Sequence, residues 1–289
     1  MPGRQRDSQP LIGLLAALAA CLSYGTASVL QAYGARSSRD PADSGAATLQ
    51  STVKAALTPA FLAGMVLDGL GFLCSLVSAR LIPLFLSQTI ISANLVVTAL
   101  LSAALLGLRL RGRDWLAIGT VVASLVVLGF TTGHLGTGTG TRGLHWALLV
   151  AALVILTGGI VLARRLGSRA AIPAGLIAGV LYGTMAVAVR VTDGLDPFRL
   201  GALLTDPAAL TVAVAGIGGF YLFTVALQLG SVNGAAAALV VGETVIPGIL
   251  GALLFGDTAR PGFDWLVVVA FCTAVAGAVA VAGMVEQAG

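Results

Sequence analysis

Residues 232–254 read VNGAAAALVVGETVIPGILGALL, and the only charged side chain in this run is that of Glu243. A helix of about 20 apolar residues crosses the roughly 30 Å hydrocarbon core of a bilayer while satisfying its own backbone hydrogen bonds. The run therefore predicts a transmembrane helix. Pro247 follows Glu243 by four residues, and it predicts a kink because proline has no N–H to bond the carbonyl group of Glu243.

The whole chain has the composition of a membrane protein. Of its 289 residues, 57% are hydrophobic and 10% are charged, with a mean hydropathy of +0.99. Too few polar side chains remain to cover a water-facing surface. We therefore predict an all-α membrane protein with nine transmembrane helices, at residues 11–33, 58–79, 83–107, 114–131, 143–163, 171–191, 207–229, 232–254 and 264–284.

Helix-entry chemistry supports several of these boundaries. Thr58-Pro59 and Asp206-Pro207 each place a capping oxygen directly before a proline at the first helical position. Residues 34–57 are polar and then offer apolar side chains at helical spacing, which favours a short helix lying in the membrane interface.

Self-similarity between the two halves indicates a duplication. Tyr24-Gly25-Thr26 matches Tyr182-Gly183-Thr184 at a shift of 158 residues, and Gly71-Phe72 matches Gly219-Phe220 at 148. We predict a first repeat at residues 11–131 and a second at 171–284, each of four helices. The intervening residues, 132–170, form an outer loop and a linking fifth helix, so the second repeat is inverted relative to the first, as in many transporters. Residues 1–10 and 285–289 are terminal tails.

Basic residues in alternate connections predict the orientation. One side holds nine of them and the other seven. The first set is Arg36, Arg39, Lys54, Arg109, Arg111, Arg113, Arg164, Arg165 and Arg169, and the second is Arg4, Arg6, Arg80, Arg142, Arg190, Arg199 and Arg260. The positive-inside rule then places the N-terminus outside and the C-terminus in the cytoplasm. The strong preference for arginine over lysine favours a bacterial source, and hence a bacterial plasma membrane.

The last two helices carry a pattern found in a known superfamily. Leu239-Val240-Val241-Gly242-Glu243-Thr244-Val245-Ile246-Pro247 is followed by Leu253-Leu254-Phe255-Gly256-Asp257 and then Trp265. This order of a carboxylate and proline, a Gly-acid pair and a further helix resembles the EamA-like branch of the drug/metabolite transporter superfamily. Residues 84–131 match more loosely, with Asn94 in place of the glutamate and Leu108 in place of the acid.

The resemblance implies a transporter fold, with small polar metabolites or amphiphilic compounds as exported substrates. That superfamily usually has ten helices in two groups of five. Nine helices, with one missing from the first half, instead resemble its NIPA-type magnesium transporter branch.

Two acids lie near the middle of predicted helices. Asp68 is nine residues beyond Pro59, about 14 Å along the helix, and Glu243 is eleven beyond Val232, about 17 Å. Asn94 is level with them and is the repeat counterpart of Glu243 within one residue. Because ionisable groups are costly in lipid, we take Glu243 and Asp68 as candidates for a coupling or cation site. The structural alternative is a kinked helix whose glutamate is neutralised or bonded to Tyr24 or Tyr182.

Other polar side chains are candidates for substrate binding. The repeat places Tyr24 and Tyr182 across a pseudo-symmetry axis, and Gln88 and Tyr221 are further candidates near the same cavity. Each has an alternative role as a hydrogen-bonding link between helices. Arg190 is expected to extend to the outer surface, and a gate ion pair is the less favoured alternative.

Several functions are excluded. The basic residues are not clustered with stacking aromatics, so nucleic-acid binding is not expected. His134 and His145 have no partner spacing, the three cysteines have neither paired spacing nor nearby histidines, and no nucleophile and base can be assembled. Neither an enzyme nor a cofactor is predicted.

The sequence leaves three hypotheses. The first is a secondary transporter that exports a small metabolite or amphiphile by alternating access, coupled to a proton or cation at Glu243. The second is a magnesium transporter using Glu243 and Asp68. The third is a subunit that does not transport, and that scaffolds envelope assembly or moves lipid. Expected partners are the lipid bilayer, the solute, and a second copy of the chain or an envelope protein.

Overall fold

Long helices make up almost all of the computed structural model, which describes residues 3–37, 58–106, 111–136, 140–195, 198–229 and 232–285. The first half of the chain contains α1 (Gly3–Ser37), α3 (Pro59–Leu81), α4 (Leu84–Ser92), α5 (Asn94–Leu106) and α6 (Gly112–Thr131). After them come α7 (Arg142–Leu166), a short 3₁₀ turn (Gly167–Ala170), α8 (Ala171–Val191), α9 (Leu200–Thr205), α10 (Pro207–Leu229), α11 (Val232–Leu250), a π-helical turn (Gly251–Phe255) and α12 (Asp264–Val285). The described residues contain two isolated β-bridges and no strand. The predicted interfacial segment, 34–57, lies mostly outside the described residues.

The predicted helix entries are confirmed at two prolines. The hydroxyl oxygen of Thr58 accepts a hydrogen bond from the N–H of Phe61 (3.3 Å), and α3 begins at Pro59. Asp206 Oδ1 accepts a bond from the N–H of Ala208 (2.9 Å), and α10 begins at Pro207. Each oxygen satisfies a backbone donor that has no partner inside its helix.

The run 83–107 forms two helices instead of the single predicted one, with a break at Ala93. The hydroxyl groups of Thr89 and Ser92 donate to the carbonyl groups of Phe85 (2.5 Å) and Thr89 (3.0 Å). Such bonds compete with the helical ladder and bend helices. Asn94 therefore begins a new helix at half depth.

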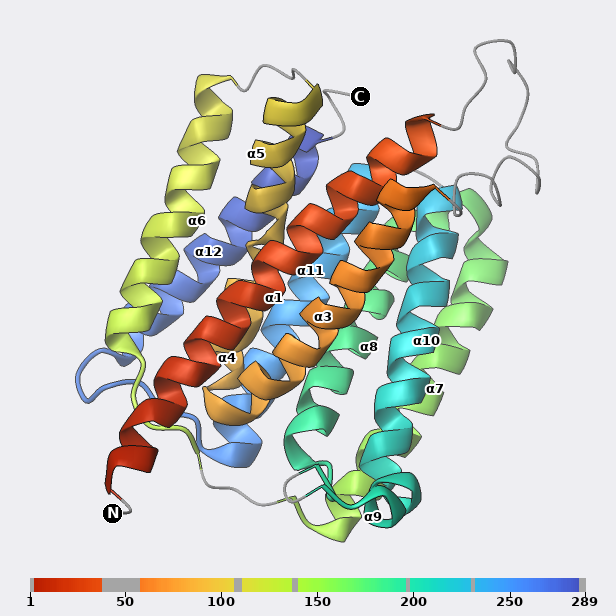
Figure 1. Cartoon of the computed structure of the whole chain (residues 1–289). Coiled ribbons are helices and arrows are strands. Elements are labelled where there is room, and N and C mark those ends of the chain that lie inside the picture. The colour runs from red at the N-terminus through yellow and green to blue at the C-terminus, as the bar shows by residue number, and fades with distance from the viewer. Residues whose placement is uncertain are drawn as a thin grey trace.

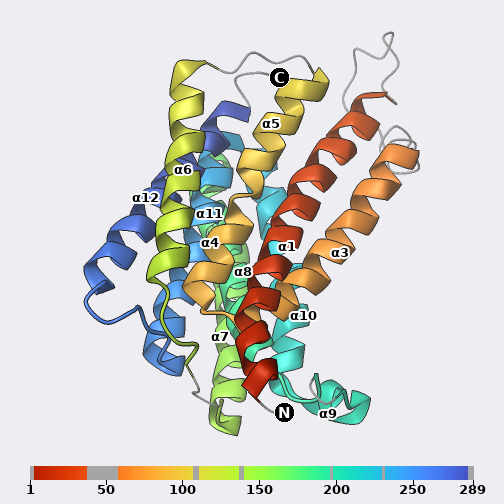
Figure 2. The same ribbon diagram turned by 60° about the vertical axis from the view of Figure 1, so that its left-hand side comes forward.

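The helices form one bundle in which consecutive long helices run in opposite directions (Figures 1 and 2). The connections after α3, α6, α8 and α11 lie at the same end as the N-terminus, and the C-terminus lies at the other end (Figure 1). We call the end of the bundle that contains the N-terminus and these four connections the N-terminal end. Helix α1 runs away from it, whereas its sequence counterpart α8 runs toward it. Helix α1 packs mainly on α3, α8 on α10 and α11, and α6 on α12.

Nine helical segments within the described residues are long and apolar enough to cross a membrane. The outward side of α3 presents Leu62, Met65, Val66, Leu70 and Leu73, all exposed. The three tryptophans, Trp115, Trp146 and Trp265, are exposed near helix starts, as in the aromatic belts of membrane proteins. These features indicate a multi-pass membrane protein.

The two halves contain matching local contacts. A Cβ atom added to Gly71 would lie 3.1 Å from ring carbons of Tyr24, and one added to Gly219 would lie 3.1 Å from the ring of Tyr182. Each glycine therefore leaves room for a tyrosine ring to pack directly on the helix backbone, and we call each of these two contacts a tyrosine seat. The sequence repeat pairs these same residues, Tyr24 with Tyr182 and Gly71 with Gly219.

A second matching contact involves the partner of each tyrosine helix. A Cβ atom on Gly25 would lie 2.8 Å from the carbonyl oxygen of Asn94, and one on Gly183 would lie 3.1 Å from that of Gly242. Helices α1 and α5, and likewise α8 and α11, thus approach closely because glycine stands at the crossing.

Candidate functional site

Four ionisable side chains from four different helices lie near half depth. Tyr24 comes from α1, Asp68 from α3, Tyr182 from α8 and Glu243 from α11. All four are half-buried. Asp68 and Glu243 both lie within electrostatic range of the two tyrosine hydroxyl groups. We call these four residues the mid-depth cluster. It joins one acid and one tyrosine from each half.

Asp68 has a partner that the sequence did not reveal. Gln31 Nε2 donates a hydrogen bond to Asp68 Oδ2 over 2.6 Å. Gln31 lies on α1, two turns beyond Tyr24, and α1 packs along α3. The bond therefore fixes this carboxylate on the α1 side of the cluster. The repeat could not indicate it, because the signal lay in helix packing and not in residue spacing.

Glu243 differs from Asp68 in having no fixed donor. Among the described residues its carboxylate forms no hydrogen bond or ion pair, neither with Tyr24 nor with Tyr182. Pro247 is fully buried in α11, and its ring packs against Gly183 of α8. Since Pro247 has no N–H, the carbonyl group of Glu243 lacks its usual helical donor. Two oxygen functions of one residue thus remain available at one depth.

The remaining predicted site residues are less closely associated with the cluster. Asn94 is half-buried at the start of α5, and its carbonyl oxygen accepts a bond from Thr98 (3.0 Å). Gln88 is half-buried on α4. Within the described part of the chain, neither side chain bonds to Glu243 or Asp68. Tyr221 is 49% exposed and lines a shallow pocket with Ile160 and Arg164 between α7 and α10, so it lies on the outer side of the bundle.

A buried ion pair at the N-terminal end corrects the expectation for Arg190. Its guanidinium forms two hydrogen bonds with Asp257, Nη1 to Oδ2 over 2.7 Å and Nη2 to Oδ1 over 2.6 Å. Only 6% of the Arg190 side chain and 0% of the Asp257 side chain are exposed. Arg190 therefore does not extend to the surface, because a bidentate carboxylate satisfies it inside the protein.

Further contacts extend this pair into a network that we call the Arg190–Asp257 clasp. The backbone N–H groups of Leu84 (2.9 Å) and Gly136 (3.0 Å) donate to Asp257, and Arg190 donates to the carbonyl oxygen of Gly136 (3.1 Å). The guanidinium also lies over the ring of Phe255, 4.8 Å from its centroid. The clasp joins the start of α4, the loop after α6, the end of α8 and the turn after α11.

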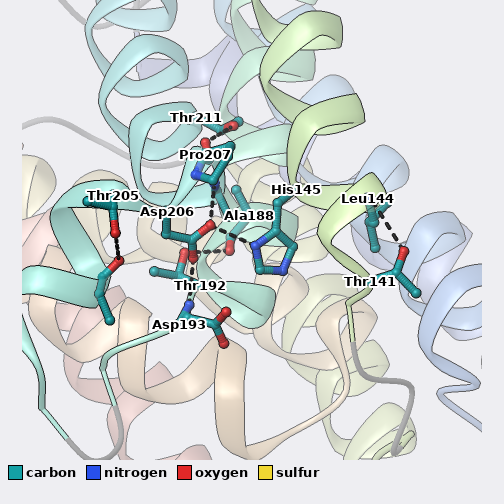
Figure 3. A network of polar contacts seen from close by, with 12 residues as sticks. Thr141, Leu144, His145, Ala188, Thr192, Asp193, Thr205, Asp206, Pro207 and Thr211 are labelled. Carbon is teal, nitrogen blue, oxygen red and sulfur yellow. Dashed lines mark hydrogen bonds and ion pairs between the residues drawn. The ribbon is translucent and has the colours of Figure 1, made fainter.

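A second buried pair lies at the same end (Figure 3), where the sequence suggested no partner for His145. His145 Nδ1 lies 2.6 Å from Asp206 Oδ1, with 5% and 3% of their side chains exposed. Asp206 Oδ1 also caps α10, and its Oδ2 accepts a bond from the N–H of Asp193 (2.6 Å). Among the described residues, His145 Nε2 has no hydrogen-bond partner.

Ligand atoms of His145, Asp193 and Asp206 lie within 4.8 Å of one another. Both oxygens of Asp206 already accept hydrogen bonds and serve the α10 cap, whereas His145 Nε2 is left without a partner among the described residues. This network connects α7, α10 and the segment after α8, all outside the first half.

No family model, no curated protein and no solved structure matches this chain. The likeness to drug/metabolite transporters therefore stays a prediction from the sequence.

Proposed function

We propose that this protein is a secondary transporter of the bacterial plasma membrane, working by alternating access between two inverted four-helix repeats. The observation that carries the proposal is the mid-depth cluster. It brings two acids and two tyrosines from α1, α3, α8 and α11 within electrostatic range of one another's hydroxyl or carboxyl groups, with both acids acting on both tyrosines. Ionisable groups at membrane depth are costly to keep there, so they mark candidate solute or ion pathways.

The paired tyrosine seats support the repeat on which this mechanism depends. Tyr24 lies on Gly71 and Tyr182 on Gly219, in helices that run in opposite directions. Transporters built from inverted repeats bind solute near the midplane, between the repeats. The mid-depth cluster is the corresponding site in this proposal.

The polar contacts at the N-terminal end support the proposed orientation. Arg80 donates to the carbonyl oxygen of Thr192 (2.9 Å), and Arg190 is held by Asp257. Two of the seven basic residues assigned to this side are thus engaged inside the protein. The basic residues that remain in the connections are then fewer at the N-terminal end than at the opposite end, which favours an outer N-terminal end and a cytoplasmic C-terminus.

Glu243 is the proposed coupling residue. A half-buried carboxylate without fixed donors gains stability by taking up a proton or a cation, and the nearby tyrosine hydroxyl groups can follow that change by hydrogen bonding to the solute. Small polar metabolites or amphiphilic compounds, exported against uptake of the coupling ion, are the substrates that the family resemblance implies.

Reconstitution in liposomes tests this assignment. A panel of amino acids and amphiphilic cations is first screened for thermal stabilisation of the purified protein, and hits are followed by flux and an internal pH dye. Glu243→Gln should abolish ion-coupled flux while the protein remains monodisperse. The matched control is Asp264→Asn, which removes an exposed acid at the start of α12 and should leave flux unchanged. Wild-type flux in Glu243→Gln would contradict the proposal.

Magnesium transport is the second candidate, favoured by the two free oxygen functions of Glu243 and by a second carboxylate, Asp68, near half depth on α3. Mg²⁺ keeps several waters and can be held by one or two carboxylates. Liposomes loaded with a magnesium-sensitive dye separate the candidates, because only this one predicts Mg²⁺ entry lost in both Glu243→Gln and Asp68→Asn. A protein that moves no tested solute and co-purifies with lipid or an envelope protein would instead support the role without transport.

A further inference from the structure

We propose that the Arg190–Asp257 clasp is the gate that holds the N-terminal end of the bundle closed. This inference rests on the proposed function, because a gate has a role only if solute crosses. Arg190 and Asp257 would then act on the positions of helices and not on the solute itself.

The clasp connects elements that must separate if this end is to open. Asp257 follows α11 and Arg190 ends α8, both in the second half, whereas the Leu84 N–H that also binds Asp257 begins α4 in the first half. Arg80 of α3 adds a parallel link to the carbonyl oxygen of Thr192 at the end of α8. The links from α3 and α4 therefore converge on the last turn of α8 and on Asp257 beside it. Separate backbone bonds join the end of α6 to the turn after α11, between residues 131–134 and 258–260.

Apolar packing around the clasp closes the same end. A cluster of buried residues from α3, α4, α7, α8, α10 and the π turn surrounds it: Ala79, Leu84, Leu148, Val187, Ala188, Val189, Val191, Ala208 and Phe255. Leu84 and Val187 are 0% exposed. We take this packed arrangement of the apolar layer and the clasp as the closed form of the N-terminal end.

The chemistry of the clasp suits reversible closure. In a dry interior, a bidentate Arg–Asp pair with additional donors resists separation, because each ion would be left without a partner. Once water enters, both ions are hydrated and separation costs little. An apolar contact lacks this difference, because exposing it to water is always unfavourable.

The His145–Asp206 pair supplies a matched comparison. It is equally buried and lies at the same end, but it joins α7, α10 and the segment after α8. None of these elements belongs to the first half. Breaking it should loosen the α7–α10 region without separating α4 from α8.

A cysteine probe tests the gate without needing a known solute. Ser87 is 0% exposed one turn beyond Leu84, where its hydroxyl group lies 2.7 Å from that of Ser78. Ser87→Cys is introduced after Cys21, Cys74 and Cys272 are replaced by alanine. A membrane-impermeant maleimide is then added to sealed vesicles of each orientation. Asp257→Asn should raise the labelling rate about tenfold, only from the side of the N-terminal end.

Two further variants keep the result interpretable. Arg190→Lys keeps the charge but loses the bidentate geometry, and should give an intermediate rate if Asp257→Asn does not fold. His145→Gln should leave the rate at that of the Ser87→Cys parent. Unchanged labelling in both clasp variants, or an equal rise in His145→Gln, would overturn the gate.

The two proposals can fail separately. If clasp variants raise the labelling rate but the protein shows no ion-coupled flux, the proposed opening of the N-terminal end is kept and the transport function is rejected. If flux depends on Glu243 but clasp variants leave the labelling rate unchanged, the transport function is kept and the proposed gate is rejected.

Discussion

The N-terminal end and the mid-depth cluster both contain carboxylates inside the bundle, but they treat them differently. Asp257 accepts bonds from both nitrogens of Arg190 and from the backbone of Leu84 and Gly136. Glu243 accepts none from any described residue. A carboxylate held by fixed donors stabilises one arrangement of helices, whereas one without them is free to respond to a proton, cation or solute. The comparison separates structural acids from candidate functional ones.

The largest loss of stability is expected from Asp257→Ala. It leaves the Arg190 guanidinium buried without its partner, which costs about 3–5 kcal/mol. Unfolding by SDS titration in mixed micelles measures this loss. Asp264→Ala removes an exposed acid and should change stability little. A small effect of Asp257→Ala would mean that water already reaches the clasp.

Asp206→Ala should have an intermediate effect. It removes the α10 cap and leaves the N–H of Asp193 and the ring of His145 without acceptors, a loss of about 2–3 kcal/mol. Asp193→Asn is the matched control, since only the backbone of Asp193 makes the observed bond. If both variants lose equal stability, the side chain of Asp193 has a role of its own, which a metal ion at this site would explain.

Gly71→Ala and Gly219→Ala test whether the halves are equivalent. Each new methyl group would press on a tyrosine ring at 3.1 Å, and we expect similar losses of about 1 kcal/mol. Gly69→Ala is the control, because a Cβ atom there meets nothing within 4 Å. Losses that differ by more than about 1.5 kcal/mol between the two variants would count against matched tyrosine seats.

The smallest loss is expected from Glu243→Gln, under about 1 kcal/mol, since no fixed donor is left unpaired. The same substitution should abolish ion-coupled flux. Glu243 should therefore matter greatly for flux and little for stability, whereas Asp257 should matter greatly for stability. Circular dichroism and SDS titration of the variant used for flux provide the check. A loss as large as that of Asp257→Ala would make Glu243 a structural residue.

The sequence by itself determined the nine apolar segments that are long enough to cross a membrane, because each crossing must satisfy its backbone over about 20 apolar residues. It did not reveal that the third of them is broken at Ala93. The predicted 171–191 and 207–229 agree with α8 and α10. Caps at Thr58 and Asp206 were also predictable, since capping depends on neighbours within one turn. The depth of Asp68 and Glu243 followed from helical rise alone.

Only the tertiary structure decided which polar groups meet. Arg190 and Asp257 are 67 residues apart, and Asp206 and His145 are 61 apart. Their pairing depends on how the helices are rotated and on a π-helical turn after α11, and local spacing carries no record of either. The same holds for Gln31 beside Asp68. Hydrophobic periodicity fixes where a helix crosses the membrane, but side-chain partners follow from packing between helices, which is a property of the whole bundle.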